Sequence, residues 1–272
     1  QTIRTNRYLY GCSSVRLRFG IEKLWRLMMV NKNFEGKKAI IVGASGGMGS
    51  VISKMLSSKG VHCALFGRDE NKLESTRSAC SSSGAECSIF SCDISSPSSI
   101  KECSEAAIKR LKGLNFMIHC AGDYNKAAAD DCDLETWDKI LDINLRSTYH
   151  FARYLLPEIN KTPNGAVIRI NSRDAPHAGI GIQTIQKRGI DGYMQVLFED
   201  VREYGTKICT INPGFVNTSM VNPERLNPEL MMQPNDIADV VEFVLNTSET
   251  ICPTEITVQP QRSPWKQSGQ HL

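Results

Sequence analysis

The sequence predicts a single α/β domain in which helices cover both faces of a doubly wound, parallel sheet. Three observations predict this class. The 272 residues are 41% hydrophobic, enough for one full core. Short apolar runs alternate with longer amphipathic ones, and each short run closes at Gly, Asn or Asp, as buried parallel strands do. We expect the domain over residues 36–259, between an extension (residues 1–35) and a tail (residues 260–272).

The expected elements follow from local pattern and punctuation. Two helical stretches are clear, one over 48–60 that ends on Gly60 and one over 134–156 that ends before Pro157. In the second, the apolar residues recur at helical spacing, at Trp137, Ile140, Leu141, Leu145 and Tyr149. Six buried strands are expected at KKAIIVG (37–43), VHCALFG (61–67), ECSIFSCDI (86–94), NFMIHCAG (115–122), GAVIRIN (165–171) and KICTINPG (207–214).

Composition excludes several classes of function. The formal net charge is only +3 and the basic residues are dispersed, so no nucleic-acid surface is expected. No apolar run approaches the ~20 residues of a membrane-spanning helix. Ten cysteines occur without a CxxC pair, and several lie in apolar runs, which predicts free thiols in a reducing compartment. A disulfide framework or a zinc site remains the alternative.

The strongest motif is GASGGMG, residues 43–49, between the first expected strand and the first helix. Gly43 permits a tight turn, Gly47 lets the backbone approach a pyrophosphate, and Gly49 allows the helix and strand to pack closely. The free N–H groups at the start of the helix favour an anion. The motif therefore predicts a nucleotide site, and a glycine turn without a ligand is the alternative.

This glycine spacing, followed in order by HCAG, DINLRS, INS and INPGFVNT, resembles the short-chain dehydrogenase/reductase family over about residues 36–259. The resemblance implies a Rossmann fold in which the glycine turn, with Ser45 and Met48, holds the pyrophosphate. It implies that Asp93 hydrogen-bonds the adenine. His119 departs from the usual Asn. The cofactor would also be bordered by Cys120, Ala121 and Gly122, and its carboxamide would be held by the loop of Pro213, Gly214, Val216 and Thr218.

The end of the second expected strand bears on the choice of nucleotide. An acidic residue there would take the ribose hydroxyls of NAD, whereas a cation can meet the 2′-phosphate of NADP. Arg68 is such a cation, and Asp69 follows one residue too late. The sequence therefore predicts NADP(H), although Arg68 could also be a solvated turn residue.

Active members of the family use a serine, a tyrosine, a lysine and an asparagine, and the resemblance places Ser172, Lys187 and Asn144 at three of these positions. Family members carry a small residue two positions beyond the lysine and a glycine five beyond it. Gly189 and Gly192 fit Lys187, which puts Gln183 at the tyrosine position. If the helix is instead registered by its distance from Ser172, Ile185 and Gly189 fall at the tyrosine and lysine positions. Either register lacks the tyrosine.

Two hypotheses follow, because a carboxamide has no pKa that could be tuned for proton transfer. In the first, the chain keeps the fold and the NADP(H) site but has lost ordinary turnover, and serves as a structural or regulatory component of an assembly. In the second, it is an active NADP(H)-dependent oxidoreductase with an altered proton donor, for which His177 or Asp174 is a candidate. The substrate pocket would be shaped by residues 219–236, whose Met and Leu side chains indicate an apolar lining or core.

The two ends suggest a location and partners. Residues 1–20 carry four arginines with no acidic residue before Glu22, a bias typical of mitochondrial targeting segments. A cytoplasmic location is the alternative. Ile21, Leu24, Trp25 and Met28 form a helical apolar stripe that must be buried, either on the domain itself or on a partner. We expect both ends to lie against neighbouring subunits, with a homo-oligomer also open.

Overall fold

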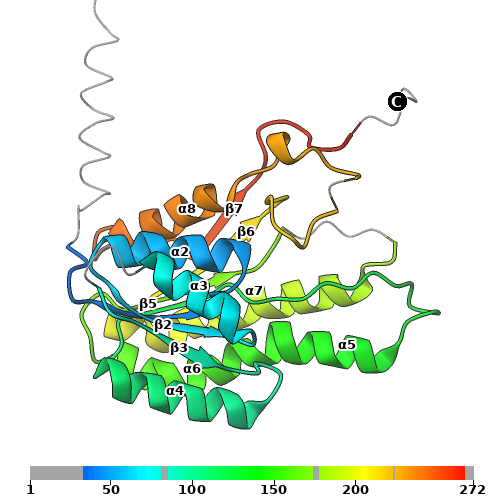
Figure 1. Cartoon of the computed structure of the whole chain (residues 1–272). Coiled ribbons are helices and arrows are strands. Elements are labelled where there is room, and N and C mark those ends of the chain that lie inside the picture. Colours follow the sequence, from blue (N-terminus) through cyan, green and yellow to red (C-terminus); the bar gives the residue numbers. More distant parts are fainter. Residues whose placement is uncertain (1–32, 81–84, 174–177, 223, 267–272) are drawn as a thin grey trace, which may run out of the picture.

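A seven-stranded, fully parallel sheet forms the centre of the computed structural model, which describes residues 33–80, 85–173, 178–222 and 224–266 (Figure 1). The strand order is β3-β2-β1-β4-β5-β6-β7. The predicted α/β fold is confirmed, and so are the six expected strands. The strands are β1 (Lys38–Val42), β2 (His62–Gly67), β3 (Cys87–Ser91), β4 (Phe116–His119), β5 (Ala166–Ile170), β6 (Lys207–Pro213) and β7 (Glu255–Val258).

The seventh strand was not predicted. β7 is only four residues long and lies at the edge of the sheet, paired with β6 alone. Its side chains alternate between exposed and half-buried positions, so it has no continuous apolar run. β7 therefore lacks the continuous apolar run by which the other six strands are recognised.

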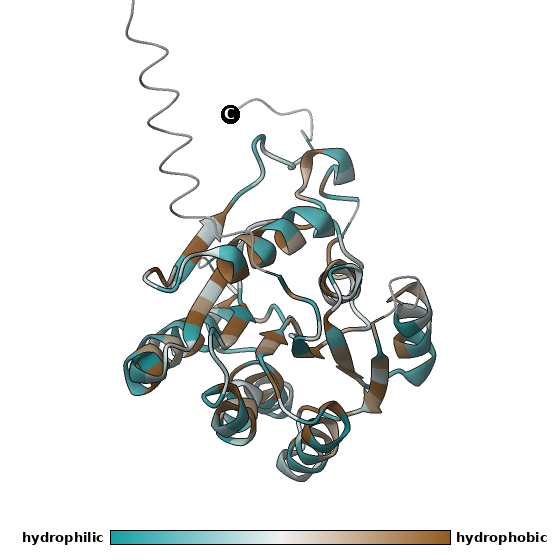
Figure 2. Cartoon of the chain, turned by 90° about the vertical axis from the view of Figure 1, so that its left-hand side faces the viewer, coloured by the Kyte–Doolittle hydropathy of each residue, from teal (hydrophilic) through white to brown (hydrophobic). Residues whose placement is uncertain are grey.

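Helices cover both faces of the sheet (Figures 1 and 2). Side chains of β1 alternate between the two layers, because Ile41 packs into the core under one set of helices and Ile40 into the core under the other. One face carries α2 (Gly47–Ser58), α3 (Glu70–Cys80) and α8 (Pro234–Asn246), and the other carries α4 (Pro97–Leu111), α5 (Leu134–Leu141), α6 (Ser147–Ile159) and α7 (Gly181–Val201).

The helix expected over 134–156 is interrupted by a π turn. α5 ends at Leu141, a π-helical segment covers Asp142–Arg146, and α6 continues to Ile159. The predicted end before Pro157 is wrong, because Pro157 lies inside α6. Leu155 and Ile159 are fully buried on either side of it, and this packing outweighs the hydrogen bond that proline cannot donate.

Both ends of the described chain pack on the domain. Phe34 is buried against Phe116, with ring centroids 6.0 Å apart. In the tail, Trp265 contacts the ring of Phe215 edge-on at 5.3 Å, and Arg225 lies over its indole. These contacts place the tail against the domain as far as residue 266. The apolar stripe and arginine-rich segment predicted within residues 1–32 lie outside the described residues.

The described ranges contain neither a membrane-spanning helix nor a metal-binding cluster. No helix within them has the length and apolar character needed to cross a membrane. Their His, Cys, Asp and Glu side chains form no cluster of three or more that could hold a metal ion.

Candidate functional site

The glycine turn between β1 and α2 is closed to side chains. Gly43 has a φ of 84°, and a Cβ on it would lie 2.7 Å from the backbone nitrogen of Ala121. A Cβ on Gly49 would lie 2.2 Å from the carbonyl oxygen of Gly43. The turn is fixed to β2, because the backbone nitrogens of Gly43 and Ala44 both donate to the carbonyl of Phe66. This turn therefore requires the glycines that the motif supplies.

The turn presents the start of a helix to an incoming group. α2 begins at Gly47, its cap residue Gly46 makes no side-chain hydrogen bond, and its first turn carries no acidic residue. A Cβ on Gly47 would lie 3.0 Å from the methyl group of Thr218, so a second loop closes over the same point. Free backbone N–H groups, a helix dipole and a cradle without side chains fit the pyrophosphate of a dinucleotide.

The strand order places this turn at the topological switch point. β1 pairs with β2 on one side and with β4 on the other, so the loops after these strands run in opposite directions. A dinucleotide seated on the turn would extend one half over β2 and β3 and the other half over β4, β5 and β6.

Arg68 and Asp93 lie on the β2–β3 side. Arg68 is exposed directly after β2, whereas the Oδ1 of Asp69 accepts a hydrogen bond from the backbone nitrogen of Lys72 at 3.1 Å. Asp69 is thus engaged at the start of α3. The hydroxyl of Ser95 and, to a smaller extent, its backbone nitrogen donate hydrogen bonds to the Asp93 carboxylate and so lower its pKa. The charge of Arg68 adds to this effect. Arg68 is the cation nearest in sequence to the expected ribose site.

A cavity of about 180 Å³ lies on the other side, over β4, β5 and β6. It is lined by residues from six separate segments of the chain, including the first half of α7. Of the predicted residues it brings together Asn144, Ser172, Gln183 and Lys187 with Met48, Ala121, Gly122, Pro213, Gly214, Val216 and Thr218. Gly43, Ser45, Gly47, Gly49, Arg68 and Asp93 do not line it.

The two registers for α7 place different side chains at the cavity. Gln183 is 2% exposed and lines the cavity together with Lys187, whereas Ile185 is 54% exposed and does not line it. The amide nitrogen of Gln183 donates to the carbonyl of Asn125 at 3.3 Å, and its oxygen accepts from Gln186 at 2.5 Å. Gln183 and Lys187 therefore occupy the face of α7 that the first register assigned to the site.

Both the side chain and the backbone carbonyl of Asn144 make hydrogen bonds within the domain. Its side chain accepts from the backbone nitrogen of Asp123 at 2.7 Å and donates to the carbonyl of the same residue at 2.8 Å. The carbonyl oxygen of Asn144 accepts from the Thr148 hydroxyl at 2.9 Å and from Arg169 at 3.1 Å. Asn144 thus fixes the loop after β4, and Arg169 bonds the carbonyl in the π turn.

Three residues at the site were not assigned a role from the sequence. Arg169 is a buried cation on β5, and its signal was a charge inside the apolar run GAVIRIN. Tyr124 lines the cavity with 49% of its surface exposed, but a tyrosine in a loop carries no pattern. His119 lies 3.0 Å from the Ser147 hydroxyl. Burial, and then the charge of Arg169, hold the pKa of His119 well below its usual value, so it is neutral.

The loop residues proposed as replacement acids, Asp174 and His177, lie outside the described residues. Tyr193 lies away from the cavity, with its ring 6.2 Å from that of Tyr149 on α6. Burial raises the pKa of Tyr193 to about 12. Tyr193 is therefore not placed to donate a proton to a group in the cavity.

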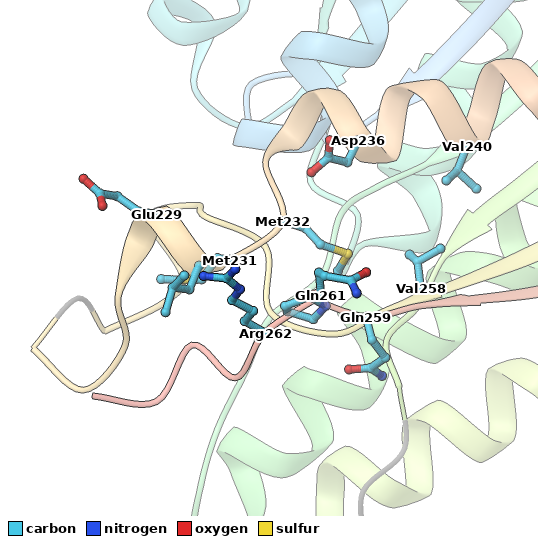
Figure 3. A pocket seen from close by; sticks show the side chains of 11 residues that line it. Glu229, Met231, Met232, Asp236, Val240, Val258, Gln259, Gln261 and Arg262 are labelled. Carbon is cyan, nitrogen blue, oxygen red and sulfur yellow. The ribbon is translucent and has the colours of Figure 1, made fainter. Parts of the chain in front are cut away.

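A second cavity, of about 520 Å³, lies beside α8 and the tail (Figure 3). Met231 and Met232 line it from the segment that was expected to shape the substrate pocket, and Arg262 lines it from the tail. Met220 and Val221, from the same segment, line the first cavity instead. The segment thus contributes to both cavities, and no predicted site residue lines the larger one.

Comparison with known proteins decides the family. The family described as short chain dehydrogenase (adh_short) matches residues 37–229, which contain the glycine turn and every residue that lines the smaller cavity. The chain belongs to the short-chain dehydrogenase family.

Its relatives are distant. An uncharacterized oxidoreductase of Staphylococcus epidermidis is 26% identical over 226 residues, covering 82% of this chain and 97% of the relative, and one of Staphylococcus aureus is also 26% identical. A Burkholderia cenocepacia short-chain dehydrogenase solved with NADP superimposes with a TM-score of 0.78 at 20% identity, over 84% of this chain and 98% of that one. A metagenomic short-chain oxidoreductase, also with NADP, gives 0.75 at 24%, over 85% and 100%. These two similarities concern the fold.

Proposed function

We propose that this short-chain dehydrogenase binds NADP(H) but has lost ordinary oxidoreductase turnover. The observation that carries the proposal is the buried Gln183 on the cavity wall, one helical turn before Lys187. The glycine cradle and the free start of α2 support retention of the nucleotide site. The altered wall of the cavity supports loss of the chemical step.

Proton transfer is the step that the side chains cannot supply in the usual way. When bound, NADPH supplies a hydride, and the oxygen of a reduced carbonyl then needs a proton. The Gln183 amide has no pKa that approaches the working pH, and its two ends are already bonded to Asn125 and Gln186. Lys187 donates to the carbonyl of Arg173 at 3.3 Å. Ser172 and Lys187 can still orient a ligand, but Gln183 cannot protonate it.

The preference for NADP(H) over NAD(H) rests on Arg68. Its exposed guanidinium follows β2, while Asp69 is engaged at the start of α3. The two structurally similar proteins that carry NADP agree with this choice. Calorimetric titration should give a lower Kd for NADPH than for NADH. If neither nucleotide binds, the proposal fails.

A second candidate function is favoured by Tyr124. This tyrosine lines the cavity from the loop after β4 and could serve as the proton donor of an active NADP(H)-dependent reductase. Tyr124→Phe tests it, because the substitution removes only the hydroxyl of a half-exposed side chain. A hundredfold loss of carbonyl reduction, with NADPH affinity unchanged, would establish the second candidate and reject the first.

We also propose that the chain serves as a structural or regulatory subunit of a mitochondrial assembly. The arginine-rich, acid-poor residues 1–20 and the apolar stripe that follows them support this role. Deleting residues 1–32 keeps Phe34, which anchors the start of the domain against Phe116. The shortened chain should lose its mitochondrial location and its copurifying subunits while retaining nucleotide binding. Unchanged location and copurification would reject this role.

A further inference from the structure

Arg169 is a buried cation at the floor of the smaller cavity. It lies on β5, is 2% exposed, and lines the cavity. Within the described residues, its hydrogen bonds all go to backbone carbonyls. Nη1 donates to His119 at 3.0 Å, to Ala121 at 3.0 Å and to Ile170 at 2.7 Å, and Nη2 donates to Asn144 at 3.1 Å.

The charge of Arg169 has no anionic partner within the described ranges. No salt bridge to it occurs there, and its Nε is buried without a hydrogen bond. Burial lowers the pKa of Arg169 to about 10, so the guanidinium stays protonated at neutral pH. Carbonyl dipoles stabilise the guanidinium, but they leave its net charge in place.

The two side chains at the end of β4, His119 and Cys120, carry no compensating charge either. Burial holds His119 neutral, and burial raises the pKa of the Cys120 thiol to about 12, so both are uncharged near pH 7. A net positive charge buried against a cavity acts on a ligand there more strongly than a surface charge does, because water and salt screen it poorly.

We infer that Arg169 makes the cavity discriminate between the two oxidation states of the nicotinamide ring, favouring the neutral reduced ring over the cationic oxidised one. The inference rests on the proposed function and takes the half of the nucleotide over β4, β5 and β6 to be the nicotinamide half. Four carbonyl contacts alone would not produce this preference, because a purely structural role affects both oxidation states equally.

The test is the ratio of two dissociation constants, measured by calorimetric titration with NADP⁺ and NADPH. The wild-type chain should bind NADPH about tenfold more tightly than NADP⁺, equivalent to about 1.4 kcal/mol. Arg169→Met, which removes the charge, should reduce that ratio at least fivefold. Arg169→Lys, which keeps a charge but not the fork of donors, should retain most of it.

A matched control is Lys207→Met. Lys207 is also a buried cation, 5% exposed, on the adjacent strand β6, and its Nζ bonds to Thr247, Ser248 and Ile251 away from the cavity. Its loss should lower stability without changing the ratio. Adenosine 2′,5′-bisphosphate, which lacks the nicotinamide, should bind wild type and Arg169→Met with the same Kd.

The outcomes separate the two claims. If adenosine 2′,5′-bisphosphate and both dinucleotides fail to bind the wild-type chain, the proposed nucleotide site is wrong, and this inference with it. If they bind but wild type shows equal affinity for NADP⁺ and NADPH, only the role of Arg169 is overturned. An unchanged ratio in a folded Arg169→Met variant overturns it as well. The wild-type ratio remains decisive should that variant fail to fold.

Discussion

The glycine turn and the wall of the smaller cavity lie at the same edge of the sheet but differ in how tightly the structure restricts their residue types. In the turn, Gly43, Gly47 and Gly49 all occupy positions where a Cβ would meet another atom at 3.0 Å or less. In the cavity wall, Gln183 stands at the expected tyrosine position, and His119 stands where asparagine is usual. Backbone packing restricts the residue types of the first region, whereas side-chain hydrogen bonds hold Gln183 in the second.

The difference reflects what each region requires. The turn is a matter of backbone shape, and any side chain on Gly49 would disturb the packing of α2 on β1. The cavity wall depends on side-chain chemistry, and there the buried Gln183 amide is hydrogen-bonded at both its nitrogen and its oxygen. A chain can therefore change its chemistry in the second region without losing its fold or its nucleotide.

The largest expected effect comes from restoring an acid to the cavity wall. Gln183→Tyr places a phenol one helical turn before Lys187 and should raise hydride transfer to a small carbonyl by at least about a hundredfold, the usual contribution of a general acid. The measurement is the decay of NADPH absorbance. Ile185→Tyr is the matched control, because that position is exposed and should give no gain. Equal gains in both variants would remove the distinction between the two registers.

A substitution in the turn should abolish binding. Gly49→Ala puts a methyl group 2.2 Å from the Gly43 carbonyl, so the turn must shift, with an expected cost of about 2–3 kcal/mol in unfolding free energy and about a hundredfold in NADPH affinity. Denaturant unfolding and calorimetry measure the two losses. The control is Gly192→Ala on α7, where an added Cβ would have no atom within 4 Å. This substitution should stabilise the chain by up to about 1 kcal/mol. Normal NADPH binding by Gly49→Ala would show that the turn does not hold the nucleotide.

The specificity of the adenosine end should depend on one cation. Arg68→Glu replaces an attraction to the 2′-phosphate with a repulsion and should reduce the preference for NADPH over NADH by at least about tenfold. Lys101→Glu changes the same charge on an exposed position of α4 and should leave the preference unaltered. A preference that survives Arg68→Glu would assign phosphate recognition to another residue.

The smallest effect concerns pH and the neutral His119. Its pKa is lowered in the folded chain, so below the ordinary value of about 6.5 the unfolded chain binds a proton that the folded chain does not. Stability should be fully present above pH 6.5 and fall by about 1–2 kcal/mol between pH 6.5 and pH 5. In His119→Asn this part of the slope should disappear from denaturant curves. Parallel slopes would mean that His119 does not set this pH dependence.

The sequence predicts the turn well and the cavity wall only in part. Gly43, Gly47 and Gly49 are visible because backbone geometry restricts the residue type. The five inner strands are visible because they are buried on both faces, and the edge strand β3 because it keeps an apolar run. Arg169 and Tyr124 required the structure, since their importance depends on contacts between β5, the loop after β4 and the π turn. The π turn itself has no hydrophobic period of its own, and β7 is too short and exposed to be recognised.

The most direct measurement is a turnover assay of the wild-type chain, saturated with NADPH and mixed with a broad panel of aldehydes and ketones, followed by nicotinamide absorbance. NADPH saturation is verified by calorimetry on the same sample. We expect NADPH to bind and the turnover rate to stay well below the ordinary range of about 1–10³ s⁻¹. A rate within that range for any carbonyl would contradict the claim that the cavity wall has lost its proton-transfer step.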